Sequence, residues 1–382
     1  MVSSPHIPRS IPFNRPSLAG RELEYVQDAV QRGHISGDGW YTKRCEVLLA
    51  EEMGGARVLL TTSCTHALEM TALLLGIGPG DEFIVPSFTF VSTANAFALR
   101  GARPVFVDVR PDTLNMDESR LADALTSRTR VIVPVHYGGV ACEMDEIGEI
   151  AQSRGVSVVE DNAHGLFGSY RGRPLGTLGS MSTLSFHETK NVSCGEGGAL
   201  VLNDPALISR AEVFREKGTD RSRFFRGEVD KYTWRDLGSS YVPSDMLAAF
   251  LLGQLEKRAS IQDARRAVWN RYRTELADWA GKRGVQLPVA APHVNPAYHL
   301  FHMLLPSFGE RQALIAHLKR HDIQAIFHYL PLHLSEMGQR FGGRPGDCPV
   351  AESVSDRIVR LPFFASLEVS DQTRIVEAVR SF

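Results

Sequence analysis

The sequence predicts an α/β protein, with a mostly parallel central sheet in a large domain and a small C-terminal α+β domain. Over roughly the first 200 residues, short apolar runs alternate with amphipathic segments, which is typical of strands joined by helices. The runs are rich in β-branched residues and apolar on both faces, as strands buried between helices are. A proline-rich stretch then precedes a shorter mixture of helical and extended segments.

The elements of the large domain follow in order. Residues 57–63 (RVLLTTS) predict a strand, and residues 64–76 (CTHALEMTALLLG) predict a helix that the turn-forming GIGPGD ends. The strand pattern recurs at residues 82–87, 103–109, 130–137, 156–161 and 181–186. Helices are expected between them at residues 90–101 and 143–154.

A long helical stretch, residues 244–279, changes its apolar spacing along its length, which suits a connector between two domains. We therefore place a boundary near residue 255, with a large domain at 1–255 and a small domain at 256–382. Beyond the proline-rich linker at residues 287–299, the small domain is expected to use these segments: LFHMLLP, the helical RQALIAHLKRH, IQAIFHYLP and a final helix after SLEVSDQ.

Composition excludes several classes of protein. A formal net charge of -2 gives no reason to expect nucleic acid as a partner. Five scattered cysteines without a CxxC pair suggest neither a disulfide framework nor a zinc site, and so a reducing compartment. The N-terminal residues lack an apolar signal core, and no run approaches the roughly 20 apolar residues of a membrane span. We expect a soluble, cytoplasmic protein.

Polar residues gather where the predicted strands end, which is where open α/β sheets bind ligands. Residues 63–67 (SCTHA) lead into a helix whose free N–H groups could hold an anion, although a simple helix cap explains them equally well. Phe88 and Phe90 follow the second strand, as core residues or as an aromatic face. Asp161 and His164 follow the strand at 156–161, and Ser185 and Lys190 follow the next apolar run.

An anion site, an aromatic face, an acid and a lysine are the parts of a pyridoxal 5'-phosphate site. The cofactor's aldehyde needs an amine, which a partly desolvated lysine supplies. A carboxylate must keep the pyridine nitrogen protonated, because the pyridinium withdraws electrons from the substrate carbanion. The phosphate needs N–H groups and hydroxyls, and the ring needs a flat apolar surface.

These residues are also where the chain resembles the DegT/DnrJ/StrS sugar aminotransferases, which have the fold type I of pyridoxal phosphate-dependent transferases. The resemblance covers residues 11–364 and includes SFHETKN, PSFTFVSTANAFALRGA and FHYLPLH. Within the family, the chain looks closest to the transaminases that form dTDP-4-amino-4,6-dideoxygalactose from dTDP-4-oxo-6-deoxyglucose and L-glutamate. A ping-pong reaction through pyridoxal and pyridoxamine forms (PLP and PMP) is therefore implied, with 2-oxoglutarate as the other product.

The resemblance implies a role for each site residue. Lys190 bonds to the cofactor aldehyde and then carries the proton between the cofactor and the substrate, and Asp161 pairs with the pyridine nitrogen. Phe90 stacks on the ring, and His164 lies near its hydroxyl. Ser185 contacts the phosphate together with the main chain of Cys64 and Thr65. Glu196, in the GEGG turn, is expected to shape the loop beside the cofactor, with its role left open.

One position departs from the family pattern. Many relatives carry G-x-N-x-R where this chain has GSSYV, so Ser240 replaces an asparagine that reaches a phosphate across a dimer interface. Ser240 contributes a shorter hydroxyl or leaves that contact to water. The resemblance implies a homodimer whose active sites lie at the subunit interface.

The nucleotide-sugar pocket is predicted from Tyr329 and His333, with cationic groups in the stretch Arg223 to Arg235. A solvated surface explains those arginines equally well. A different 4-oxo sugar such as a pentose, and either C4 configuration, stay open.

Three other functions fit the sequence less well. Related sugar dehydratases carry histidine at the lysine position, and a non-catalytic binding protein would lack a cofactor residue. A nicotinamide dehydrogenase would carry G-x-G-x-x-G where this chain has SCTHAL. Lys190 and the complete set of cofactor residues favour the aminotransferase.

Overall fold

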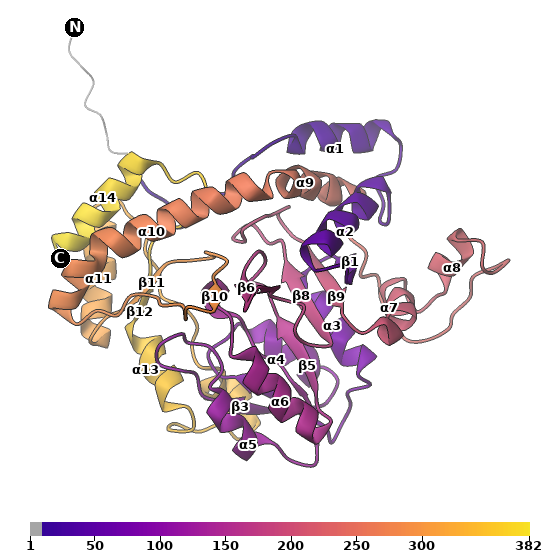
Figure 1. The fold of residues 1–382 in the computed structure, drawn as a ribbon, viewed down its shortest axis with the longest axis horizontal. Coiled ribbons are helices and arrows are strands. Elements are labelled where there is room, and N and C mark those ends of the chain that lie inside the picture. Colours follow the sequence, from indigo (N-terminus) through magenta and orange to yellow (C-terminus); the bar gives the residue numbers. More distant parts are fainter. Residues whose placement is uncertain (1–9) are drawn as a thin grey trace, which may run out of the picture.

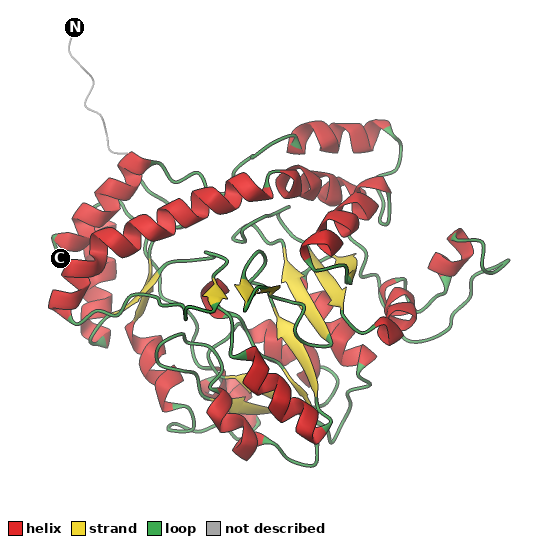
Figure 2. Ribbon diagram, viewed as in Figure 1, coloured by secondary structure: helices red, strands yellow, loops and turns green. Residues whose placement is uncertain are grey.

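A seven-stranded sheet forms the centre of the computed structural model, which describes residues 10–382 (Figure 2). The strand order is β1-β9-β8-β5-β4-β2-β3, and β9 is antiparallel to both neighbours while the other strands share one direction. The bounds are β1 Arg57–Thr61, β2 Glu82–Pro86, β3 Arg103–Val107, β4 Thr129–Ile132, β5 Ser157–Asp161, β8 Met181–Ser185 and β9 Gly198–Leu202. The predicted mostly parallel α/β sheet is confirmed, and β9 is an element that the sequence did not predict.

Helices cover both faces of the sheet, because its strands alternate apolar side chains between two buried clusters. In β1, Leu59 faces the cluster formed with α3 and α7, whereas Val58 and Leu60 face the cluster formed with α2 and α9. The helices of this part are α1 Glu22–Gln31, α2 Trp40–Glu52, α3 Cys64–Leu74, α4 Val91–Ala98, α5 Leu121–Ala124, α6 Met144–Arg154, α7 Ile208–Arg215 and α9 Asp245–Glu256.

The predicted helix at residues 244–279 is two helices. The helix α9 ends at Glu256 and α10 spans Arg258–Arg283, so the break lies at Lys257. Arg258 donates to the Leu255 carbonyl oxygen at 3.1 Å, which satisfies one of the acceptors left open at the end of α9. From this break α10 runs away from the sheet toward the C-terminal elements (Figure 1).

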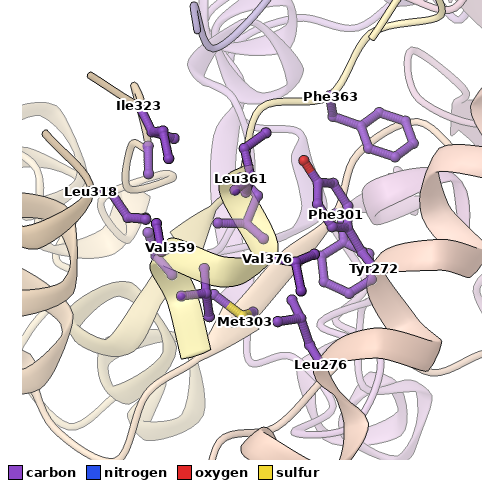
Figure 3. Close-up of a cluster of buried hydrophobic side chains, with 14 of the residues drawn as sticks. Tyr272, Leu276, Phe301, Met303, Leu318, Ile323, Val359, Leu361, Phe363 and Val376 are labelled. Atoms are coloured by element: carbon purple, nitrogen blue, oxygen red, sulfur yellow. The ribbon is translucent and has the colours of Figure 1, made fainter. Parts of the chain in front are cut away.

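The C-terminal elements enclose a separate apolar cluster, drawn in Figure 3. It combines Tyr272 and Leu276 of α10 with Met303 and Val359 of a two-stranded sheet, and it also buries Ile11 of the N-terminal segment. The elements here are β11 His302–Leu304, β12 Ile358–Arg360, α11 Phe308–Arg320, α12 Glu336–Arg340, α13 Pro349–Arg357 and α14 Val369–Arg380. The domain boundary near residue 255 stays a prediction, and Ile11 shows that the N-terminal segment also packs on the C-terminal part.

Smaller elements complete the fold. A short three-stranded sheet has the order β10-β6-β7, with β6 Ser169–Tyr170, β7 Arg173–Pro174 and β10 Val294–Asn295. The short helix α8, Arg221–Phe225, projects with its flanking loop from the body of the molecule (Figure 1). Within residues 10–382, no helix combines the length and the apolar character that a membrane crossing requires.

The large and C-terminal parts meet over a mixed apolar cluster. Phe88 and Tyr137 from the sheet side pack there with Leu300, Leu304 and Ile358 from the C-terminal side. This contact brings the C-terminal part over the segments that follow β2 and β4, and the cavity described next lies between the two parts.

Candidate active site

A cavity of about 810 Å³ lies at the ends of β5 and β8, closed by the C-terminal part. Nine residues singled out in the sequence line it: Cys64, Thr65, Phe90, Asp161, His164, Ser185, Lys190, Glu196 and Tyr329. These residues come from β-strand ends, helix starts and the C-terminal part, and the fold gathers them at one place as the topology of parallel sheets predicts.

The N-terminus of α3 forms one end of the cavity. Ser63 caps the helix by accepting from the His66 N–H at 3.1 Å, and Thr65 donates to the Ser92 hydroxyl at 2.8 Å. The neighbouring strand passes very close, because a side chain at Gly198 would lie 2.3 Å from the Cys64 nitrogen. Glycine is therefore required at this point. The first residues of α3 line the cavity, and the free N–H groups of a helix start are the donors that an anion site needs.

Asp161, the last residue of β5, is buried with its carboxylate fixed in place. Its Oδ2 accepts from the Thr93 hydroxyl at 2.7 Å, and its Oδ1 accepts from the Ala163 N–H at 3.1 Å. Because these two neutral donors hold the carboxylate without neutralising its charge, it can still pair with a cationic group of a ligand.

Lys190 lies in the turn that follows β8, where its N–H donates to the His187 carbonyl oxygen at 2.9 Å. Burial lowers the pKa of Lys190 from 10.5 to about 8, and the positive charge of Arg360 adds to that effect while Asp161 opposes it. The amine is therefore neutral and nucleophilic far more often near neutral pH than an exposed lysine would be.

His164 faces the same cavity from a stacked pair of histidines. Its ring lies 4.1 Å from the ring of His299 with an interplanar angle of 19°, and the Gly138 N–H donates to its Nδ1 at 3.3 Å. Burial holds the pKa of His164 well below its usual value, so the ring is neutral. Since Nδ1 accepts, the proton of the neutral ring is on Nε2, which leaves Nε2 as a donor.

Phe90 and Tyr329 form an aromatic wall at the mouth of the cavity. The Phe90 side chain is 55% exposed, which leaves its ring free to cover a flat ligand, and its centroid is 6.3 Å from that of Tyr329. Tyr329 in turn stacks on His328 at 3.5 Å. Phe88, by contrast, is buried in the apolar contact between the two parts, so it serves as core.

Three of the features predicted from the sequence lie outside the lining of this cavity. His333 is buried outside the cavity lining, with its ring nitrogens against the Ser87 hydroxyl and the Glu352 carboxylate, so this geometry gives it a structural role. Ser240 is exposed and lies away from the cavity of its own chain. The stretch Arg223 to Arg235 is also outside the lining, and its arginines pair with acidic neighbours such as Glu228 and Asp220.

Glu196 lies at the edge of the cavity, where its exposed carboxylate is 3.7 Å from the ring of His187. The glycines on either side of it allow the chain to turn, since Gly195 has a φ of +87° and a side chain at Gly197 would meet the Cys194 sulfur at 2.7 Å. Glu196 therefore lines the cavity, and its place beside the cofactor stays a prediction.

Four residues of the site were missed in the sequence: Ser92, Thr93, His299 and Arg360. Thr89 and Thr93 are four residues apart, a spacing that could have signalled a contact, and their hydroxyls are 3.1 Å apart although Thr89 lies just before the start of α4. Nothing local marks His299 or Arg360, because only the packing of the C-terminal part turns them toward the cavity.

The donor set fits pyridoxal 5'-phosphate. The close approach of Gly198 to α3 leaves a cradle of N–H groups and hydroxyls suited to the phosphate, and the fixed Asp161 carboxylate suits a pyridinium. A lysine with a lowered pKa suits the aldehyde. Fold and site together define a transferase of the pyridoxal phosphate-dependent class.

Comparisons with known proteins identify the family. Residues 16–380 match the model of the DegT/DnrJ/EryC1/StrS aminotransferase family. The chain is 32% identical to the spore coat polysaccharide biosynthesis protein SpsC of Bacillus subtilis, over 97% of this chain and 96% of that protein. The crystal structure of the aminotransferase TlmJ from Streptoalloteichus hindustanus superposes with a TM-score of 0.90 at 32% identity, covering 98% of each chain.

A third relative is known with its cofactor. The PMP form of the putative sugar aminotransferase Spr1654 from Streptococcus pneumoniae has a TM-score of 0.90 at 27% identity, covering 97% of this chain and 98% of that one. This chain belongs to the DegT/DnrJ/EryC1/StrS aminotransferase family. It is a sugar aminotransferase that uses pyridoxal phosphate, as its fold and site had indicated.

Proposed function

We propose that this enzyme transfers the amino group of L-glutamate to C4 of dTDP-4-oxo-6-deoxyglucose and so forms a dTDP-4-amino-4,6-dideoxy sugar. The observation that carries the proposal is the meeting of Lys190, with its lowered pKa, and the fixed carboxylate of Asp161 in one cavity of about 810 Å³. A cavity of this size accommodates a cofactor and part of a substrate together.

The chain's own residues would divide the work. The bound cofactor supplies an electron sink for the carbanion formed when the substrate loses a proton. Asp161 keeps a cationic ring nitrogen charged, and the His164 Nε2–H is available to donate to a ring oxygen. Lys190, whose amine lies in the same cavity, would remove a proton from the donor carbon as general base and return it as general acid. Ser185, Thr65 and the N–H groups of α3 hold the phosphate.

The sugar specificity rests on the segment FHYLPLH, one of those that resemble the dTDP-4-amino-4,6-dideoxygalactose transaminases. Phe327, His328 and Tyr329 of this segment line the cavity, and the Tyr329 ring lies beside that of Phe90. Apolar and aromatic walls of this kind suit a deoxygenated sugar and a nucleobase, which both present flat or apolar surfaces.

The test follows the absorption of the cofactor-loaded enzyme while L-glutamate and then dTDP-4-oxo-6-deoxyglucose are added. We expect the band of the lysine-bound cofactor to fall with glutamate and to return with the sugar. NMR of the isolated product then fixes the site and configuration of the new amine. A Lys190→Ala variant is expected to lose both changes, and full turnover by that variant would contradict the role given to Lys190.

Other outcomes point to other substrates. A band that falls with glutamate but returns only with a 4-oxo pentose would replace the hexose while keeping the aminotransferase. Release of a deoxygenated sugar without an amino group would favour a dehydratase. Because a single methyl or hydroxyl group changes binding by only about 1–3 kcal/mol in an apolar pocket, the sugars have to be compared by kcat/KM.

We also propose that the enzyme is a cytoplasmic homodimer with its active sites at the interface. The segment around α8 supports this, because it projects from the body and exposes large apolar side chains, with Phe225 65% and Trp234 77% exposed (Figure 1). In such a dimer, Ser240 of one chain would lie near the phosphate end of the other chain's cavity. Sedimentation velocity checks the assembly, and a monomer with full activity would contradict it.

A further inference from the structure

Among the residues that the structure describes, one cation of the cavity has no counter-charge. Arg360 is the last residue of β12 and the only arginine lining the cavity in the described part of the chain. One of its terminal nitrogens donates to the Phe327 carbonyl oxygen at 3.1 Å. Its Nε is shielded from solvent and has no hydrogen-bond partner within residues 10–382, and no carboxylate there forms an ion pair with the guanidinium.

Another buried arginine of the C-terminal part shows how such a group is normally satisfied. Arg265 donates from Nε to the Tyr298 carbonyl oxygen at 3.0 Å, and from a terminal nitrogen to the His299 carbonyl oxygen. Both contacts are internal, and they fix the loop that carries His299. The incomplete pairing of Arg360 is therefore a property of its position beside the cavity.

The backbone holds Arg360 firmly in this position. Arg360 pairs with His302 across the β11–β12 ladder. Its N–H donates to the Ile326 carbonyl oxygen at 2.7 Å, and its carbonyl oxygen accepts from the Ile326 N–H at 3.2 Å. The guanidinium carbon lies 4.8 Å from the centroid of the Phe13 ring, which packs against one face of the side chain. A side chain fixed by two strands and a ring is preorganised to receive a ligand group.

The groups around Arg360 do not neutralise it. Burial raises the pKa of both Tyr137 and Tyr329, so these phenols stay neutral. Asp161 is already held by Thr93 and Ala163, and Lys190 adds positive charge. Because a shielded charge without a partner is costly, a ligand that supplies an anion here gains binding energy.

The position of Arg360 indicates which anion fits. Its contacts are with Phe13 of the N-terminal segment and with Ile326 and Phe327 of the C-terminal part, whereas the proposed phosphate end is built by α3, Ser92 and Ser185. Arg360 is nevertheless close enough to Lys190 to lower the pKa of its amine. The reacting amine of a donor must lie at Lys190, and in an α-amino acid the carboxylate is attached to the same carbon. A planar guanidinium can grip that carboxylate through two parallel hydrogen bonds.

We propose that Arg360 binds the α-carboxylate of the amino donor and so selects an amino acid for the first half-reaction. The inference rests on the proposed function and adds a donor-binding residue to it. The keto sugar has no carboxylate at the corresponding atom, so the second half-reaction does not use this contact. One cavity therefore binds two very different substrates, and Arg360 contacts only the amino acid.

The test compares Arg360→Gln and Arg360→Lys with the wild type in the two half-reactions, each measured as a single turnover. For Arg360→Gln we expect kcat/KM with L-glutamate to fall by about 100-fold, because the carboxylate loses a charged bidentate partner. The PMP-loaded variant should aminate the keto sugar within about threefold of the wild type, a change too small to represent a lost contact. Arg360→Lys should recover part of the loss as a point charge.

A binding measurement without turnover supports the kinetics. Titration calorimetry of 2-oxoglutarate into the PLP-loaded enzyme measures carboxylate binding alone, because this ketone has no amine to transfer. Arg360→Gln should weaken that binding markedly. The matched control is Arg357→Gln, three residues earlier. The half-buried side chain of Arg357 lies outside the cavity lining and donates to the Ser353 carbonyl oxygen, so this variant should leave both half-reactions and the titration unchanged.

Failures of the two proposals are distinguishable. If Arg360→Gln lowers kcat/KM only in the sugar half-reaction, Arg360 would bind the diphosphate of the nucleotide sugar. If it lowers kcat/KM equally in both half-reactions, Arg360 would have a structural role. Either result overturns the inference. If the wild type rejects this sugar, the glutamate half-reaction still tests Arg360. If the wild type rejects glutamate, a panel of other α-amino acids tests the same carboxylate, and an effective donor amine without a carboxylate would overturn the inference.

Discussion

Capture of the cofactor by the apoprotein should show the lowered pKa of Lys190 directly. Only the neutral amine attacks an aldehyde, and its pKa is about 8 where an exposed lysine has 10.5. The difference corresponds to about 3 kcal/mol, so at pH 7 the neutral fraction is about 300-fold larger than for an exposed lysine. The capture rate should therefore rise with pH up to about 8 and then level off.

Two substitutions should move this plateau in opposite directions. Arg360 lowers the pKa of Lys190, so Arg360→Gln should shift the plateau to higher pH. Asp161 raises that pKa, so Asp161→Asn should shift the plateau to lower pH. Stopped-flow absorption measures the rate, and borohydride trapping with peptide mass analysis confirms the bond to Lys190. The free cofactor has the same pH dependence in every assay, so a difference between variants in the pH of the plateau arises from the protein. A rate that climbs past pH 10 in the wild type would refute the reasoning.

Other substitutions test separate parts of the site. Thr93→Val removes the hydroxyl that holds Asp161 and should weaken PLP binding about tenfold in a fluorescence titration. Thr93→Ser keeps the hydroxyl and should keep the affinity. Equal PLP affinity in the two variants would contradict this role of Thr93. Gly198→Ala would place a carbon 2.3 Å from the Cys64 nitrogen, so it should lower the free energy of unfolding by about 1–3 kcal/mol and weaken PLP binding. Denaturant unfolding measures the first effect. The control is Gly148→Ala, which has open space around it in α6 and should not destabilise the fold. Trp234→Ser should shift sedimentation toward monomer if the α8 segment forms the dimer, and Val369→Ser on α14 is the exposed control.

The sequence predicted those elements whose signals are local. Strands β1, β2, β3, β5 and β8 are short buried runs bounded by turn residues, and each lies within its predicted range or overlaps it closely. Lys190, Asp161 and Ser185 could be found because each follows such a run. Strand β9 was missed because Gly198 begins it, and a glycine-rich stretch usually indicates a turn. The reason for that glycine, the close passage past Cys64, exists only in three dimensions.

The residues that the sequence did not reveal depend on packing between distant segments. Thr93 is one of several small polar residues in α4, and only the placement of that helix beside β5 directs it to Asp161. Arg360 interrupts an apolar run, and arginine side chains are mostly exposed to water. The register of β12 against β11 and the bridge to Ile326 turn it inward instead. His333, chosen for its place in an aromatic segment, is directed to Ser87 and Glu352 by the same kind of long-range contact.

The charges of the cavity explain why its ligands must be anionic. Lys190 and Arg360 bring two cationic groups, Asp161 is the one buried carboxylate among the described lining residues, and Glu196 lies at the exposed edge beside His187. The histidines His164, His299 and His328 add no charge, because burial holds the pKa of each well below its usual value. A phosphate at α3 and a carboxylate at Arg360 would therefore each meet positive potential. The donor's reacting carbon is then held between two anchored anionic groups, one on the cofactor and one on the donor itself, within reach of the lysine that moves its proton.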